Sequence, residues 1–128
     1  MNETARGTFE VVITPQETDD AIGRLTLDKT WSGDLVATGH GLMLSAGDPA
    51  QGRAGYVALE VVDGTLHGRS GSFAFQQLGV MRDGDQELRY DVVPGSGTGG
   101  LIGIDGSLAL TIDDRGHAYV LTYRLPDD

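Results

Sequence analysis

Cysteine is absent from this sequence of 128 residues. Its absence excludes a disulfide framework, a thiolate nucleophile and a zinc site built on thiolates. It agrees with a reducing cytoplasm, where disulfides are rare. Long apolar runs are also absent, and the polar amino terminus carries no signal-peptide pattern. We therefore expect a cytoplasmic protein that does not bind a membrane.

Basic residues are scarce: 9 Lys and Arg stand against 19 Asp and Glu, which gives a formal net charge of −10. A field of that sign repels the phosphates of nucleic acids and the surface of anionic lipid. The few basic residues are also scattered along the chain rather than clustered. We expect no nucleic-acid partner, and we attribute the acidity to solubility, because several pairs of aspartates fall in turns.

A helical hydrophobic period is missing too, and the loop from Gly47 to Gln51 leaves room for one helical turn at most. Apolar residues instead alternate with period two in short runs, which indicates half-buried strands. These runs are Phe9-Val11-Ile13, Leu25-Leu27, Leu88-Tyr90-Val92, Leu108-Leu110-Ile112 and Tyr119-Leu121-Tyr123. Turn sequences rich in glycine separate them. We predict one all-β domain over residues 1–128, a closed antiparallel barrel of about eight strands.

The turns predict the register of each hairpin, and the register predicts which side chains face inward. A two-residue turn at Ser32-Gly33 would pair Trp31 with Asp34 and would leave the next two glycines facing outward. The inner face would then comprise Leu25, Leu27, Lys29, Trp31, Val36, Thr38, His40, Leu42 and Leu44. A turn at Asp83-Gly84 would likewise put Gln77 opposite Tyr90 on the inner face. Phe73, Phe75 and Val92 share that face.

A third turn, at Asp63-Gly64, would pair Glu60 with His67. Parity then places Tyr56, Glu60, His67 and Arg69 on the inner face with the phenylalanines, provided that no bulge interrupts the strand near Gly68–Gly71. The same count sends four apolar side chains outward: Val57, Leu59, Val61 and Leu66. An apolar outer patch of this kind is typical of a subunit contact, so we expect a homo-oligomer.

Three segments carry a family resemblance: GYVALE at Gly55–Glu60, GTLHGRSGSF at Gly64–Phe73 and VPGSGTG at Val93–Gly99. Leu25–Lys29 and Ser96–Gly106 also fit the pattern, so the likeness covers nearly the whole chain. It resembles the bacterial domain of unknown function 3224. The resemblance implies a barrel similar to allene oxide cyclase with a central cavity, and a glycine turn similar to that of dirigent proteins. It implies no established activity.

The chemistry predicted from this register centres on Glu60, His67 and Arg69. Directly opposed strand residues have Cβ atoms about 5 Å apart, close enough for a carboxylate to contact an imidazole. Such a pair could act as general base and acid, with the guanidinium stabilising developing negative charge. A structural cluster of ion pairs at the rim of the barrel is the competing interpretation. The predicted ligand-binding residues are Trp31, His40, Tyr56, Phe73, Phe75, Gln77, Tyr90 and Tyr119.

Three hypotheses of function follow. The first is a barrel that binds a small apolar or amphipathic molecule in its cavity. The second is an isomerase, cyclase or lyase without a cofactor, and the third is a structural oligomeric protein. His40, His67 and His117 share inward parity in this count, which would allow a zinc site. No two of them have short ligand spacing, so we expect neither a metal nor a cofactor.

Overall fold

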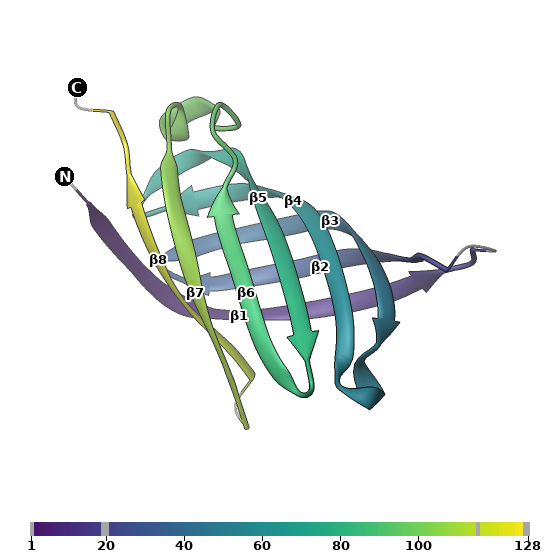
Figure 1. Ribbon diagram of the computed structural model, residues 1–128. Coiled ribbons are helices and arrows are strands. Elements are labelled where there is room, and N and C mark those ends of the chain that lie inside the picture. The colour runs from purple at the N-terminus through teal and green to yellow at the C-terminus, as the bar shows by residue number, and fades with distance from the viewer. Residues whose placement is uncertain (1, 19–20, 115, 127–128) are drawn as a thin grey trace.

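A computed structural model describes residues 2–18, 21–114 and 116–126 and shows a closed antiparallel barrel of eight strands, as the sequence predicts (Figure 1). Each strand pairs with the next along the chain, and the first pairs with the last. The strands are β1 (Glu3–Gln16), β2 (Gly23–Gly33), β3 (Leu35–Asp48), β4 (Arg53–Leu66), β5 (Arg69–Arg82), β6 (Asp85–Val92), β7 (Asp105–Asp113) and β8 (Gly116–Arg124). Two short 3₁₀ helices, η1 (Pro49–Gln51) and η2 (Gly99–Leu101), lie in the connections. Within the described residues, no helix is long and apolar enough to span a membrane.

The strands form because apolar side chains alternate along them and face one enclosed space. The members of each period-two run share one face of their strand, and three of them, Ile13, Leu88 and Ile112, remain 47%, 39% and 63% exposed. Phe9, Leu27, Tyr90, Val92, Leu108, Tyr119, Leu121 and Tyr123 are buried in the interior. The alternation therefore predicted the inner face of β1, β2, β6, β7 and β8 correctly.

The two ends of the barrel differ. One end is closed by the long connection between β6 and β7, which contains η2 and lies at the same end as both termini (Figure 1). Leu101 and Ile104 of this connection are fully buried, and the Thr98 amide donates to the Ser72 carbonyl at 2.8 Å. At the opposite end lie η1, the β5–β6 turn and the β7–β8 turn. We call this end the mouth.

Aromatic rings fill the closed half of the barrel. The indole of Trp31 lies 4.7 Å from the ring of Phe9, 5.1 Å from that of Tyr119 and 5.6 Å from that of Phe75, measured between centroids. Phe73 packs edge-on against Phe75 at 5.0 Å. The interior of this half is therefore occupied by the hydrophobic core.

The predicted register of the β2–β3 hairpin is wrong. Trp31 pairs with Ala37 rather than Asp34, and this odd-numbered shift reverses the faces of β3. The Tyr119 hydroxyl sets the real turn, because it accepts from the Leu35 amide and donates to the Ser32 carbonyl, both at 3.0 Å. Val36, Thr38 and His40 consequently face solvent, and Leu42 and Leu44 lie on the outer surface. Lys29 and Trp31 do face inward, as predicted.

The β4–β5 turn also lies elsewhere than predicted. It is formed by His67 and Gly68, both with positive φ, and Asp63-Gly64 is part of β4. The pairing then runs without a bulge from Leu66↔Arg69 to Ala54↔Met81. Since the turn moved by an even number of residues, Glu60 and Tyr56 keep the predicted inward direction. Leu66, predicted to face outward, is fully buried.

The β5–β6 hairpin is as predicted. Asp83 and Gly84 form the turn with positive φ, and Gln77 pairs with Tyr90. A tight two-residue turn of this kind fixes the register locally, without help from the rest of the molecule.

Candidate functional site

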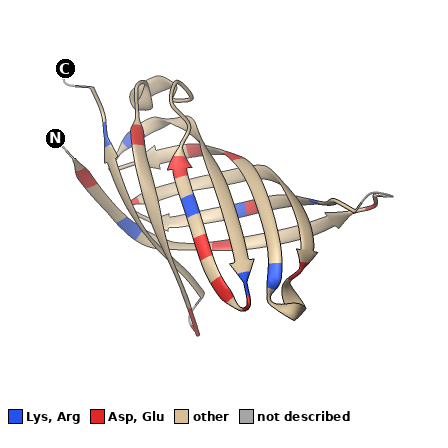
Figure 2. Cartoon of the chain, in the orientation of Figure 1, with Lys and Arg blue, Asp and Glu red and all other residues tan. Residues whose placement is uncertain are grey.

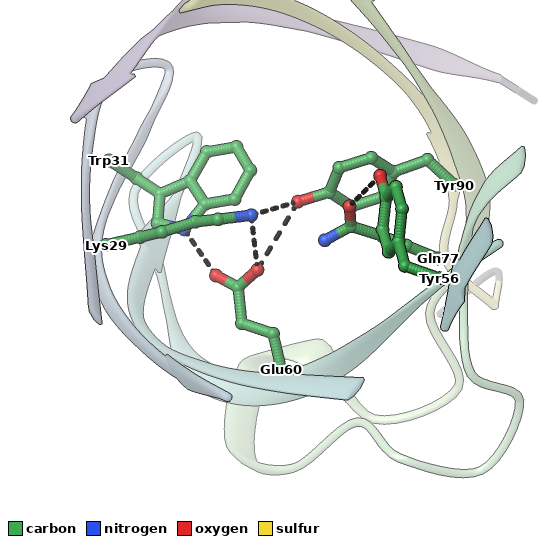
Figure 3. Close-up of polar contacts among 6 residues, drawn as sticks. All are labelled: Lys29, Trp31, Tyr56, Glu60, Gln77 and Tyr90. Carbon is green, nitrogen blue, oxygen red and sulfur yellow. Dashed lines mark hydrogen bonds and ion pairs between the residues drawn. The ribbon is translucent and has the colours of Figure 1, made fainter. Parts of the chain in front are cut away.

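Four polar side chains meet in the middle of the barrel, and we call them the inner cluster: Lys29, Trp31, Glu60 and Tyr90 (Figure 3). The Lys29 ammonium donates to Glu60 Oε1 and to the Tyr90 hydroxyl, both at 2.8 Å. The Trp31 indole N–H donates to Glu60 Oε2 at 2.9 Å. Glu60 is 1% exposed and Lys29 is 6% exposed. Across the described residues, no buried side-chain nitrogen or oxygen lacks a hydrogen-bond partner, so this network is complete.

Two glycines of β3 make room for the Glu60 carboxylate. A Cβ on Gly39 would lie 2.1 Å from Glu60 Oε2, and a Cβ on Gly41 would lie 3.0 Å from Glu60 Cα. Gly41 is also the cross-strand partner of Glu60. These are the two glycines that the sequence register placed outside. They face the lumen, and their missing side chains let a carboxylate reach the centre of the barrel.

In the inner cluster, the pKa of Lys29 is lowered and the pKa of Tyr90 is raised. Burial lowers the pKa of the Lys29 ammonium, and the attraction of Glu60 counteracts part of this effect. Burial raises the pKa of Tyr90 well above its ordinary value, and the nearby Glu60 carboxylate raises it further. Tyr90 therefore stays a neutral phenol, and its hydroxyl donates to Glu60 Oε1 at 3.3 Å. The buried Glu60 carboxylate thus accepts three hydrogen bonds, from Lys29, Trp31 and Tyr90, which compensate for its burial.

A second polar layer separates the inner cluster from the mouth. The Tyr56 hydroxyl donates to the Gln77 side-chain carbonyl at 3.2 Å (Figure 3). The Tyr56 ring lies across its cross-strand partner Gly79, where an added Cβ would come within 2.1 Å of Cε1. Burial raises the pKa of Tyr56, so this hydroxyl is uncharged near neutral pH.

Beyond Tyr56 the barrel opens into a cavity of about 360 Å³, which we call the mouth cavity. Its walls come from β2 to β7 and are mostly apolar. They include Leu25, Met43, Ala54, Tyr56, Met81, Leu88, Leu110 and Ile112. The cavity thus combines a mostly apolar wall with four polar residues, Ser45, Tyr56, Gln86 and Glu87, of which Tyr56 belongs to the Tyr56–Gln77 layer.

The structure does not bring the predicted catalytic residues together. Glu60 pairs with Phe75, not with His67, so the predicted acid–base contact is wrong. His67 lies in the β4–β5 turn at the closed end, where its Nδ1 shares a hydrogen bond with the Tyr123 hydroxyl. Arg69 follows on β5 and is exposed. The error has one cause: the turn comes four residues later along the chain than the sequence pattern indicated.

The histidines are also dispersed. The His40 side chain is on the outer surface, and its Nδ1 lies 2.6 Å from Asp28 Oδ1. Its inward placement, and with it a ligand-binding role in the lumen, is a wrong prediction of the β2–β3 register. His117 stacks on Phe9 with ring centroids 4.8 Å apart. Among the described residues, no three His, Asp or Glu side chains are grouped so that they could hold a metal ion.

Of the other predicted ligand-binding residues, only Tyr56 lines the mouth cavity. Gln77 and Tyr90 are in the two polar layers beneath it. The remaining four, Trp31, Phe73, Phe75 and Tyr119, are buried in the core. Their inward direction was predicted correctly, but packing leaves them no contact with the cavity.

Sequence reasoning missed several residues of the site. Lys29 was placed inside but was given no role, although a lone lysine among apolar inward residues signals a buried ion pair. Gly39, Gly41 and Gly79 carry a signal as well, since glycine in a strand interior marks a close approach. The wrong register of β3 would also turn Met43 outward, whereas it lines the mouth cavity.

Comparisons with known proteins agree with this fold. The model of a family described as "Protein of unknown function (DUF3224)" matches residues 5–123. A crystal structure of a protein of unknown function from the same family, from Shewanella oneidensis MR-1, is 40% identical to this chain. The similarity covers 100% of both chains with a TM-score of 0.93. Among curated proteins, none matches. The resemblance to domain of unknown function 3224 is thus confirmed, and the likeness to allene oxide cyclase stays a prediction.

Proposed function

We propose that this chain, which belongs to the DUF3224 family of proteins of unknown function, binds a small neutral amphipathic molecule in its mouth cavity. The observation that carries the proposal is an apolar cavity of about 360 Å³ that meets the Tyr56–Gln77 polar layer. This volume falls within the range of about 300–1,000 Å³ typical of small-molecule sites, which combine apolar walls with a few polar groups.

The polar layer and the charge of the molecule select a neutral ligand. Tyr56 and its partner Gln77 carry no charge, and the Tyr56 hydroxyl, which lines the cavity, can bind one polar group of a ligand. An anion would meet no positive partner in the walls of the cavity and would be repelled by a chain of formal net charge −10. A cation would lose its hydration among mostly apolar walls, and Glu87, the carboxylate at the cavity, is itself exposed to solvent and is a weak counter-charge.

The inner cluster supports this site from below without taking part in chemistry on the ligand. Both oxygens of Glu60 already accept hydrogen bonds, one from Lys29 and one from Trp31. The carboxylate is 1% exposed and is not among the residues that line the cavity. Binding therefore fits this geometry better than general-base catalysis by Glu60, which needs the carboxylate within reach of a substrate proton.

Fluorescence titration with the neutral probe N-phenyl-1-naphthylamine tests the proposal. Trp31 is the only tryptophan of the chain, so energy transfer from it to the probe reports binding to the barrel. We expect a saturable signal that 1-decanol displaces. Leu88→Glu, which places a charge in the cavity wall, should weaken probe binding about tenfold or more.

Val12→Glu is the matched control. Val12 is 64% exposed on the outer surface of β1 and does not line the cavity, so its replacement should leave probe binding unchanged. Tyr56→Phe should retain the probe and weaken 1-decanol about fivefold, because only a hydroxyl ligand uses the phenol. The proposal is wrong if neither molecule binds saturably, or if Val12→Glu abolishes binding while Leu88→Glu has no effect.

A further inference from the structure

An apolar patch covers the outer surface of β3, β4 and β5. We call it the outer patch, and it comprises Leu42, Leu44, Val57, Leu59, Val61 and Leu78. The sheet register arranges its centre in two rows across the strands. One row runs Leu44–Val57–Leu78–Arg89, and the other runs Leu42–Leu59–Gln76–Asp91. Between them lies a shallow groove of about 500 Å³.

The side chains of the patch are exposed to an extent that surface strands rarely leave uncovered. Leu44, Val57, Leu59, Val61 and Leu78 are between 37% and 59% exposed. Together they present on the order of 500 Å² of contiguous apolar surface, which is near the upper limit for a monomeric protein. A stable interface buries about 800 Å² on each partner, and the patch would supply most of the apolar part of such an area.

We propose that a second copy of this chain covers the outer patch, forming a dimer with two-fold symmetry. The charges at the patch favour this occupant. The chain has a formal net charge of −10 and would repel another copy at most places on its surface. At the β6 side of the patch, however, Arg89 forms an ion pair with Asp91 at 3.3 Å, so that rim presents charges of both signs. Acidic residues flank the basic one along this strand (Figure 2).

The two rows determine how two copies can meet. A two-fold axis that lies in the interface, perpendicular to the strands and between the rows, places each row over the other row of the second copy. Arg89 then faces Asp91 of the second copy, and the reverse contact forms at the same time, as a two-fold interface requires. Val57 and Leu59 face each other in the same way at the centre, where apolar contacts contribute most.

Other occupants fit the patch less well. The strands that carry the patch, β3, β4 and β5, are each paired on both sides, so a partner cannot add a strand there and must pack on the face of the sheet. Anionic lipid is disfavoured by the net charge, and the acidic groups beside Arg89 leave no basic cluster to attract it. The outer patch is complementary to itself, so a second copy of the chain can cover it without any other partner.

Sedimentation velocity across a wide concentration range tests the dimer. We expect the mass of two chains for the wild type, and we expect Leu59→Glu to raise the dissociation constant about 100-fold by burying an unpaired charge. Val12→Glu is the matched control, since Val12 is 64% exposed on the outer surface of β1, away from the patch, and should leave the dimer intact. Unchanged circular dichroism of Leu59→Glu would show that the barrel still folds.

A charge exchange tests the arrangement of the two copies. Arg89→Asp alone should weaken the dimer about tenfold, because two pairs of like charge would meet, and Asp91→Arg added to it should restore the affinity. A wild type that stays monomeric up to its solubility limit would overturn the proposal. So would a ring of three chains, a dimer insensitive to Leu59→Glu, or a double variant that fails to recover.

Discussion

Glu60 shows at the scale of a single residue how a buried charge becomes tolerable. Its carboxylate accepts from an ammonium and from an indole N–H, each within 3 Å. Removing one member of such a pair leaves the other charge buried without compensation, which destabilises more than the pair itself stabilises. The inner cluster is therefore expected to respond asymmetrically to substitution.

Glu60→Gln keeps the shape of the side chain and removes its charge. We expect it to lower the free energy of unfolding by about 3 kcal/mol, since the Lys29 ammonium would remain buried without an anion. The double variant Lys29→Met, Glu60→Gln should recover part of this loss. Urea denaturation measures both values, and a double variant less stable than Glu60→Gln would contradict the account.

Tyr90→Phe tests the protonation of the phenol. The pKa of Tyr90 is raised from 10.0 by burial and by Glu60, so its contribution to stability is fully present below pH 10 and is lost as pH rises further. The wild type should exceed the variant by about 1–2 kcal/mol near neutral pH, from the lost hydrogen bonds.

Above pH 10 the advantage of the wild type should shrink, by up to about 1.4 kcal/mol per pH unit. The other tyrosines titrate in both proteins and cancel in this difference. Urea denaturation of the pair at several pH values gives the result, and a difference that grows above pH 10 would mean that the phenol is not held neutral by the fold.

At the scale of elements, β3 accommodates the inner cluster because Gly39 and Gly41 have no side chains where they approach Glu60. Gly39→Ala would bring a Cβ to 2.1 Å from Glu60 Oε2, and we expect a loss of about 2 kcal/mol in the free energy of unfolding. Gly55→Ala on β4 is the control, because the nearest atom to its Cβ would be the Gly79 carbonyl oxygen at 3.7 Å. That variant should change stability by less than about 0.5 kcal/mol or stabilise, as the unfolded chain loses freedom. Equal losses in thermal or urea unfolding would refute the close-approach argument.

The hairpins show how far sequence alone predicts this fold. Asp83-Gly84 forms its own turn, so the pairing of Gln77 with Tyr90 followed from local chemistry. The β2–β3 turn is held by the Tyr119 hydroxyl on β8, a contact distant in sequence that no turn propensity contains. At β4–β5, Gly64 resembles a turn glycine, but it is needed in the strand because a Cβ there would lie 2.2 Å from the Val36 carbonyl oxygen.

In the candidate site, too, the sequence predicted what depends on local pattern and not what depends on distant contacts. Inward placement of Glu60 and Tyr56 depends only on parity, and parity survived an error of four residues in the turn position. Contacts such as Glu60 with Lys29 depend on the exact register of three strands, and one of those registers was mispredicted. The alternation of apolar residues thus predicted which side chains face the interior better than it predicted which of them contact one another.

The whole molecule combines a closed end, a polar middle and an open mouth. Aromatic packing fills the first, the inner cluster fills the second, and the third is the cavity in which we propose that a ligand binds. The outer patch lies on the outside of the same strands. Since alternate residues of a strand serve opposite faces, β4 can contribute Tyr56 to the lumen and Val57 to the outer surface independently.

The most direct test of the ligand site is methyl NMR with labelled methionine. Met43 and Met81, two of the three methionines, line the mouth cavity. On titration with 1-decanol, the account predicts saturable shifts of both methyl resonances that leave labelled methyls of Leu42 and Leu59 unmoved. Shifts at these leucines with Met43 and Met81 unchanged would contradict it.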